Sequence, residues 1–184
     1  MKLAKFTYFV LFVFYSMSSF AEKSFFKDIS NLLPDQKPRL SYGVAVTDFD
    51  NDGSDEFIVT GFGYENLALG YDGNSLKNKI KENIFSDFNR STIGVAACDI
   101  DKDGHEEIYF LNTDTYSGQK MYSDRLLKLV DKNIEDLFEK DINQDELNLT
   151  AGRSVVCVDR EGKGNYGIYV ANYGGPTRFY EYIE

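Results

Sequence analysis

The sequence contains no tryptophan, only three prolines, one histidine and two cysteines in 184 residues. A single histidine, His105, and the absence of any Cys-x-x-Cys pair argue against a zinc site, which needs clustered Cys and His ligands. The same shortage removes the usual hydrolase groupings, because one histidine inside an acidic loop supports no Ser/His/Asp or Cys/His set. We therefore do not expect an enzyme.

Long hydrophobic runs are also missing, except at the N-terminus. There, Lys2 and Lys5 precede an apolar run over residues 6–17, and residues 19–21 (Ser-Phe-Ala) have the pattern of a cleavage site. The run is shorter than the roughly 20 residues that span a membrane, which disfavours an uncleaved anchor. We predict a signal peptide over residues 1–21, a secreted or periplasmic protein without a membrane span, and a mature chain over residues 22–184.

Positive charge is scarce, since 20 Lys and Arg stand against 30 Asp and Glu and the net charge is -10. Removing residues 1–21, which carry two lysines and no acids, takes the net charge to -12. Such a chain is not attracted to nucleic acid or to anionic lipid. Its 13 Tyr and 15 Phe indicate a packed interior instead of disorder. Much of the negative charge lies in two short clusters, which suggests a cation site.

The two cysteines, Cys98 and Cys157, are expected to enter an oxidising compartment. Cys98 lies one residue before Asp99, whereas Cys157 lies two residues before Asp159. On strands of period two these offsets point to opposite faces. A disulfide between two repeats and a pair of buried free thiols both remain open.

Internal repetition is the strongest feature of the sequence. Three Val-rich segments each end at an aspartate, and each continues through a Gly-containing acidic turn into a second strand and then a third. The first strands cover residues 42–48, 93–99 and 152–159, the second 57–61, 108–112 and 168–172, and the third 67–71, 126–130 and 177–182. An apolar-x-Asp-apolar element at 26–29, 85–88 and 134–137 precedes each unit and supplies a fourth strand.

Units of about four short strands with turns between them are typical of β-propeller blades. A sandwich of meandering strands is the alternative, but it would not require the acidic turn to recur at the same place in every unit. We predict an all-β protein of about three propeller-type blades, each of four antiparallel strands. Because propellers have roughly four to eight blades, this is an incomplete propeller.

Two of the acidic turns carry the pattern D-x-D-x-D-G-x-x-E, over residues 48–56 and 99–107. Calcium takes roughly six to eight oxygen ligands, and such a run can wrap around the ion once glycine permits the sharp turn. Carboxylates stand at positions 1, 3, 5 and 9, and the main-chain carbonyl at position 7 is a further candidate. The predicted ligands of two Ca²⁺ ions are Asp48, Asp50, Asp52, Ser54 and Glu56, and Asp99, Asp101, Asp103, His105 and Glu107.

Two other interpretations of these turns are weaker. An EF-hand needs a bidentate Glu at position 12 and flanking helices, but position 12 is Val59 or Phe110, inside an apparent strand. A turn without metal would leave four carboxylates repelling one another, in two separate places. The third turn, residues 159–167, has Lys163 at position 5 and Gly167 at position 9. We expect no calcium there, and expect the Lys163 ammonium to take the place of the ion.

The strand–loop–strand unit resembles the FG-GAP/VCBS repeats of integrin α-chains, which are calcium-binding propeller blades. Residues 42–48, 97–101, 106–113, 151–155 and 168–173 are similar to the N-terminal part of the cartilage acidic protein family. The similarity runs from about Phe26 to the end of the sequence. It implies secretion and a seven-bladed propeller with further modules after it, of which this chain would hold three repeats.

These features favour a secreted calcium-binding FG-GAP repeat protein that acts as a non-enzymatic binding or adhesion scaffold for an extracellular protein or glycan. One alternative is a propeller enzyme, a lyase or hydrolase with a site in the channel. Another is a truncated remnant without independent function. An arc of three blades has open edges, so self-association is expected, and two copies could complete a six-bladed ring.

Overall fold

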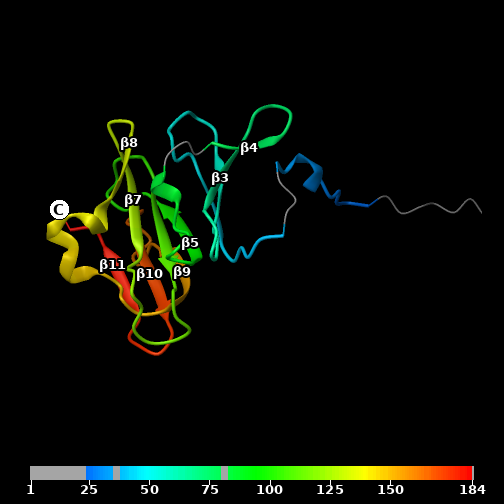
Figure 1. Ribbon diagram of the computed structural model, residues 1–184. Helices are drawn as coiled ribbons and strands as arrows, with labels where there is room; N and C mark the ends of the chain where they lie inside the picture. Colours follow the sequence, from blue (N-terminus) through cyan, green and yellow to red (C-terminus); the bar gives the residue numbers. More distant parts are fainter. Residues whose placement is uncertain (1–23, 35–37, 80–82, 184) are drawn as a thin grey trace, which may run out of the picture.

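The computed structural model describes residues 24–34, 38–79 and 83–183, so the signal peptide predicted over residues 1–21 lies outside the described residues. Eleven strands in these ranges form three antiparallel sheets that stand side by side (Figure 1). We call the sheets blade one, blade two and blade three in chain order. No helix in the described ranges is long and apolar enough to cross a membrane.

Each blade pairs its strands in the order in which they follow along the chain. Blade one consists of β1 (Val44–Thr47), β2 (Glu56–Val59), β3 (Leu67–Tyr71) and β4 (Leu76–Asn78). Blade two consists of β5 (Thr92–Cys98), β6 (Glu107–Asn112), β7 (Arg125–Val130) and β8 (Asn133–Asp136), and blade three of β9 (Gly152–Val158), β10 (Gly167–Asn172) and β11 (Arg178–Glu181). Four short 3-10 helices lie between strands or before them: η1 (Ser30–Leu32), η2 (Asn83–Phe85), η3 (Leu137–Glu139) and η4 (Asp141–Glu146).

The hydrophobic core lies between the blades, in two layers. Alternate residues of a strand point to opposite faces, so each blade can pack against both neighbours. In blade two, Val95 and Ile108 pack against blade one, whereas the next residue, Tyr109, packs against blade three. The first layer contains Ile58, Ala68, Phe85, Val95, Ile108, Phe110 and Leu127, and the second contains Cys98, Ile100, Tyr109, Leu111, Leu126, Phe138, Ile168 and Val170.

The nine strands predicted from the three repeats are all present, and the predicted all-β class of propeller-type blades is confirmed. The prediction of the fourth strand was wrong in two places, because residues 26–29 and 85–88 form no strand, and only residues 134–136 do so, within β8. Blade one takes its fourth strand, β4, from the segment after β3, and blade three has three strands.

The apolar-x-Asp pattern has a different role at the junction of blades one and two. Asp87 and Asp136 are both buried, and Arg125 donates to both, from Nη1 to Asp87 Oδ1 at 3.0 Å and from Nε to Asp136 Oδ2 at 2.9 Å. Buried charges need such pairing to offset their loss of hydration. In these two copies of the pattern the aspartate thus belongs to a buried ion pair, and only the segment of Asp136 also forms a strand.

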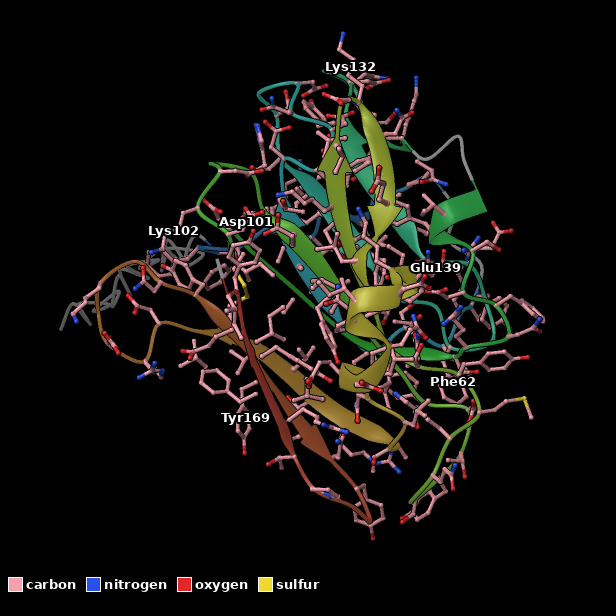
Figure 2. All side chains as sticks on the ribbon, turned by 90° about the vertical axis from the view of Figure 1, so that its left-hand side faces the viewer. Phe62, Asp101, Lys102, Lys132, Glu139 and Tyr169 are labelled. Carbon is pink, nitrogen blue, oxygen red and sulfur yellow. A yellow bond between two sulfur atoms is a disulfide. The ribbon has the colours of Figure 1, made fainter. Side chains whose placement is uncertain are left out.

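Cys98 and Cys157 form a disulfide that joins β5 of blade two to β9 of blade three, with their Cα atoms 6.3 Å apart (Figure 2). Of the two states that the sequence leaves open, the disulfide is therefore the one present. The opposite orientation of the two cysteines is the reason that they meet. When two similar blades stack, opposite faces of the two blades meet. A cysteine on one face of blade two therefore lies against a cysteine on the opposite face of blade three.

Candidate metal centre

The three acidic loops each join the first two strands of a blade, and they share one backbone conformation. The residues at positions 4 and 6 have positive φ in every loop: Asn51 and Gly53, Lys102 and Gly104, Gly162 and Gly164. The carboxylate at position 1 closes each turn by accepting the amide of the position 6 glycine, at 2.9, 3.0 and 2.6 Å respectively. Local sequence therefore sets the loop geometry in all three blades, including the one that lacks the full set of acids.

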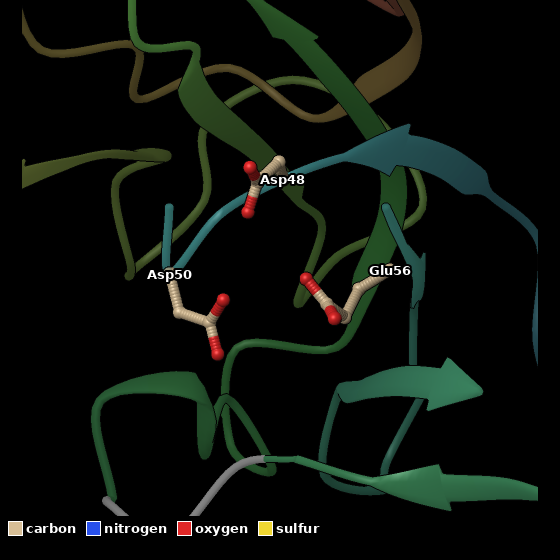
Figure 3. A group of neighbouring side chains, drawn as sticks. All are labelled: Asp48, Asp50 and Glu56. Carbon is tan, nitrogen blue, oxygen red and sulfur yellow. The ribbon is translucent and has the colours of Figure 1, made fainter. Parts of the chain in front are cut away.

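Loop one gathers three carboxylates around one point. Figure 3 shows Asp48, Asp50 and Glu56 turned toward a common space, and one carboxylate oxygen of each lies within 4.8 Å of the other two. Asp48 and Asp50 come from the loop itself. Glu56 is the first residue of β2, and its pairing with Thr47 at the end of β1 places it beneath the loop. Asp50 is exposed, so the cluster is open to solvent on one side.

Glu56 is the least satisfied group of this cluster. Its side chain is fully buried, and neither carboxylate oxygen has a hydrogen-bond partner within the described residues. Burial, and after it the charges of Asp50 and Asp52, raises the pKa of Glu56 to about 7. A buried carboxylate without a donor is costly, so this arrangement needs either a proton or a cation between the three side chains.

Loop two repeats the arrangement with Asp99, Asp101 and Glu107, whose oxygens also lie within 4.8 Å of one another. Glu107 is buried at the start of β6, and burial raises its pKa, but its Oε2 accepts the Ile100 amide at 2.9 Å. Asp99 Oδ1 is buried without a hydrogen-bond partner in the described part of the chain. The two loops therefore offer the same kind of oxygen cluster to a cation.

A lysine already lies against the acids of loop two. Lys128, from β7, donates from Nζ to Asp101 Oδ2 and Asp103 Oδ2 at 2.6 Å and to Glu107 Oε1 at 2.8 Å. Burial acts to lower the pKa of Lys128, but these three hydrogen bonds outweigh it and hold that pKa above its usual value. The ammonium thus occupies the mouth of the cluster as a competing cation.

Loop one has no equivalent lysine on β3. The pairing of Phe57 with Leu69 in blade one and of Ile108 with Leu127 in blade two makes Gly70 the counterpart of Lys128. Lys79, beyond β4, reaches the loop instead, but its Nζ stays 3.4 Å from Asp52 Oδ2 and 3.9 Å from Glu56 Oε1. Loop one is therefore less fully neutralised by its lysine than loop two.

The remaining predicted ligands lie at the rim of the clusters. Asp52 and Asp103 stand outside the groups of converging carboxylates, and each accepts the amide of the position 7 residue, Ser54 or His105, at 2.9 Å. Hydrogen bonds from Lys79 and Lys128 respectively lower the pKa of these two aspartates. The structure thus brings together positions 1, 3 and 9 of each loop, and positions 5 and 7 lie around them.

Loop three keeps the turn but not the cluster. Lys163 donates to Glu161 at 2.7 Å and its side chain is 68% exposed, so its ammonium pairs with one carboxylate at the surface. Glu181, the counterpart of Lys128 in this blade, accepts from Arg160 of the loop. The loop is held by salt bridges where the other two present converging acids.

Sequence analysis missed Lys128 and Lys79 because neither belongs to the loop pattern. Lys128 is 27 residues from Asp101, and only the antiparallel register of β6 and β7 brings it there. Strand register could have located Lys128. Leu127 pairs with Ile108, so the next residue, Lys128, lies opposite the end of the loop.

Comparisons with known proteins relate the sequence to one family. The family described as FG-GAP-like repeat matches residues 48–110, which contain both complete acidic loops. Cartilage acidic protein 1 of Mus musculus is 45% identical over 171 residues, which cover 83% of this chain and 26% of that protein. The proteins of the same name from Homo sapiens and Xenopus tropicalis are each 44% identical, with 83% and 79% of this chain covered. The chain thus spans about a quarter of the length of these curated relatives.

Proposed function

This chain is a homologue of the cartilage acidic proteins, with an FG-GAP-like repeat over residues 48–110, and on this premise we propose that it is a secreted calcium-binding scaffold that acts by binding and not by catalysis. The similarity to these relatives and the propeller-type blades support a non-enzymatic repeat protein. The predicted signal peptide supports secretion or export to the periplasm.

The observation that carries the calcium assignment is the state of Glu56. A carboxylate that is fully buried, without a donor, and turned toward two further carboxylates needs a cation more than any surface acid does. Loop two supports the assignment independently, because the same positions converge there and a lysine ammonium neutralises them.

Calcium fits these loops better than zinc or a transition metal. The converging groups are all carboxylates, the oxygen ligands that hard cations prefer, and no Cys or His side chain belongs to either cluster in the described residues. Asp52 and Asp103 at position 5 and the carbonyls of Ser54 and His105 at position 7 would complete coordination. The flexible seven- or eight-fold shells that calcium accepts suit a loop that is open to water on one side.

The two sites should not be equal. Calcium can enter loop one with Lys79 still in place, because that ammonium lies beside Asp52 and not at the centre of the cluster. At loop two, calcium must first displace Lys128 from three carboxylates. We therefore assign the tighter site to loop one and the weaker to loop two.

Calorimetric titration of chelator-treated protein with CaCl₂ tests the calcium assignment. The expected result is two binding events, with the tighter one lost in Asp50→Ala and the weaker one in Asp101→Ala. Extracellular calcium modules commonly have Kd values of about 10⁻⁴ to 10⁻³ M, so the titration should extend to millimolar calcium. No heat of binding up to about 10 mM, with unchanged melting curves in calcium and chelator, would refute the assignment.

The scaffold role draws support from a groove at the opposite end of the blades from the acidic loops. It encloses about 430 Å³, and its lining includes Tyr42, Phe62, Tyr116 and Arg153. The Arg153 guanidinium lies 5.2 Å from the Tyr116 ring centre, in cation–π contact. Aromatic and arginine side chains are the types that dominate recognition sites, and they suit an extracellular protein or a glycan.

Capture from culture medium, followed by identification of the bound material, tests this role. A partner whose binding is lost in Arg153→Ala, while calcium binding is retained, would support the scaffold. Turnover of a hydrolase or lyase substrate that is lost in the same variant would overturn the non-enzymatic assignment. N-terminal sequencing of exported protein tests secretion, and the expected first residue is Glu22.

A further inference from the structure

The disulfide between Cys98 and Cys157 lies directly behind the acidic cluster of loop two. Cys98 is the last residue of β5, so it immediately precedes Asp99, the first carboxylate of the loop. Across the sheet, Cys98 pairs with Glu107, the buried carboxylate that β6 adds to the cluster. One cysteine is therefore a direct neighbour of two of the three converging acids, along the chain for one and across the sheet for the other.

The residue on the other side of Asp99 is held by the same junction. Ile100 is buried, and it belongs with Cys98 to the layer between blades two and three, against which Cys157 packs. Asp99 itself has one carboxylate oxygen, Oδ1, that is buried without a hydrogen-bond partner in the described residues, while its Oδ2 accepts the Gly104 amide. Contacts with blade three thus hold the residues on both sides of a carboxylate that a cation would contact.

Loop one has no such covalent bond, because the chain contains no other cysteines. The equivalent of Cys98 is Thr47, which pairs with Glu56 in the same register, and its buried hydroxyl has no hydrogen-bond partner within the described ranges. Two residues further on, the Phe49 ring packs edge-on against the Phe85 ring, with 5.4 Å between the ring centres. The start of loop one is therefore held by packing, whereas the start of loop two is held by packing and by a disulfide.

We propose that this disulfide sets the calcium affinity of loop two, by fixing the position of the Asp99 carboxylate before the ion arrives. This role rests on the calcium binding proposed above and concerns only one of the two sites. Loop two needs such support more than loop one, because its ion must displace the Lys128 ammonium. A carboxylate that is already in place loses less conformational freedom on binding, which strengthens the site. Reduction of the disulfide should therefore weaken calcium binding at loop two and leave loop one unchanged.

The coupling acts in both directions. If calcium binds the disulfide form more tightly than the reduced form, then bound calcium makes the disulfide harder to reduce by the same factor. Reduction takes two electrons and two protons from a dithiol, which is itself oxidised to a disulfide, and it leaves Cys98 and Cys157 as thiols. Couplings between two sites of one protein are typically about 5- to 150-fold. Loop two thereby responds to the redox state of its surroundings as well as to calcium.

Calorimetric titration of single-site variants with CaCl₂ measures the effect. Asp50→Ala isolates loop two, and the further changes Cys98→Ala and Cys157→Ala remove the disulfide without leaving a free thiol. The calcium affinity of loop two should then fall by about fivefold or more. Asp101→Ala isolates loop one, where the same two cysteine changes should alter the affinity by less than about twofold. Circular dichroism and the melting temperature show that each variant is folded.

A matched control separates local positioning of the loop from a general loss of stability. Val170 is fully buried in the same layer between blades two and three, but it pairs with Val155 in the middle of β9, away from the acidic loops. Val170→Ala weakens the packing of this junction and leaves the disulfide intact. In the Asp50→Ala background, this change should leave the calcium affinity of loop two unchanged.

Reduction of the wild-type protein gives a second measurement, which needs no change at either cysteine. The protein is equilibrated with mixtures of reduced and oxidised dithiothreitol, free thiols are alkylated, and the two forms are separated by mass. Saturating calcium should raise the ratio of reduced to oxidised dithiothreitol at half-reduction by about fivefold or more, compared with chelator. In Asp101→Ala, which removes a ligand from loop two, calcium should not change this ratio.

The possible failures of the coupling and of the calcium assignment can be told apart. Equal calcium affinity of loop two with and without the disulfide would overturn the coupling and leave the calcium assignment standing. An equal loss of affinity in Val170→Ala would also overturn it, and so would a calcium effect on reduction that persists in Asp101→Ala. Both results would mean that the disulfide acts through overall stability. No heat of binding in any variant, including those with the disulfide intact, would refute both proposals.

Discussion

Replacing Lys128 with Met should tighten calcium binding at loop two. The ammonium of Lys128 lies 2.6–2.8 Å from oxygens of Asp101, Asp103 and Glu107, and it is the group that calcium must displace. Methionine keeps an unbranched side chain of similar length and removes the charge, so it leaves the packing along β7 nearly intact. Only the competition between two cations is changed.

The size of the effect follows from the charge that is removed. If the displaced ammonium stays about 7 Å from the calcium ion, a single and a double charge repel by about 2.4 kcal/mol at an effective dielectric constant of about 40. This dielectric constant lies between the values that apply near a protein surface and in bulk water. Since about 1.4 kcal/mol corresponds to a tenfold change, the affinity of loop two should rise by about 50-fold at low salt, and by less at physiological ionic strength.

Calorimetric titration in an Asp50→Ala background isolates loop two, because that change removes a ligand from loop one. Lys132→Met, in the turn after β7, removes the same charge from the same hairpin but lies outside the salt bridges of the loop, so it serves as the matched control. An unchanged or weaker affinity in Lys128→Met would show that the lysine does not compete with calcium. An equal gain in Lys132→Met would show that the effect is only one of net charge.

Three further predictions concern stability. With calcium 100-fold above Kd, Asp50→Ala and Asp101→Ala should each remove about 2.7 kcal/mol of calcium stabilisation, or roughly 5–10 °C in melting temperature, whereas Asp159→Ala should leave the difference between calcium and chelator unchanged. In chelator, the raised pKa of Glu56 means that the folded protein binds a proton more tightly than the unfolded chain, which adds about 3 kcal/mol to the free energy of unfolding at low pH. This contribution is complete below pH 4.5 and is lost as the pH rises to about 7. The melting temperature of Glu56→Gln should lack this decline with pH. Removing the disulfide by Cys98→Ser should cost about 4 kcal/mol in urea unfolding, because the bridge closes a loop of 59 residues, and an unchanged midpoint would contradict it.

The strands and loops could be predicted from the sequence because their determinants are local. Alternating apolar residues and a fixed aspartate locate β1, β5 and β9 to within two residues, and the glycine at position 6 fixes each turn. The fourth strand could not be placed in this way. A short apolar-x-Asp pattern looks the same in β8 as before β5, and Arg125 forms an ion pair with the aspartate of both segments. The two cases differ only in that residues 133–136 pair with β7, and a single sequence does not show that pairing.

The pairing of Cys98 with Cys157 and the position of Lys128 depend on contacts across strands and blades. The opposite orientation of the cysteines was a correct inference from strand periodicity, but its meaning changes once the blades stack. Lys128 shows the same dependence within one blade, since a register shift of one residue would turn it to the other face. A single sequence does not determine the register between strands or the stacking of blades, and these two features position Lys128 and the two cysteines.

Loop three shows what separates the two proposed calcium loops from a turn of the same shape. Its backbone has positive φ at Gly162 and Gly164, and Asp159 closes it as in the other loops, so the turn itself needs no metal. The position of Glu56 and Glu107 is taken by Gly167. A Cβ on Gly167 would lie 2.6 Å from the Tyr180 carbonyl oxygen, so β11 has closed over the space that a buried glutamate would require. The proposed calcium binding therefore depends on the strand after the loop as much as on the loop. A blade keeps the buried carboxylate and its need for a cation, or it packs the next strand against a glycine and keeps only the turn.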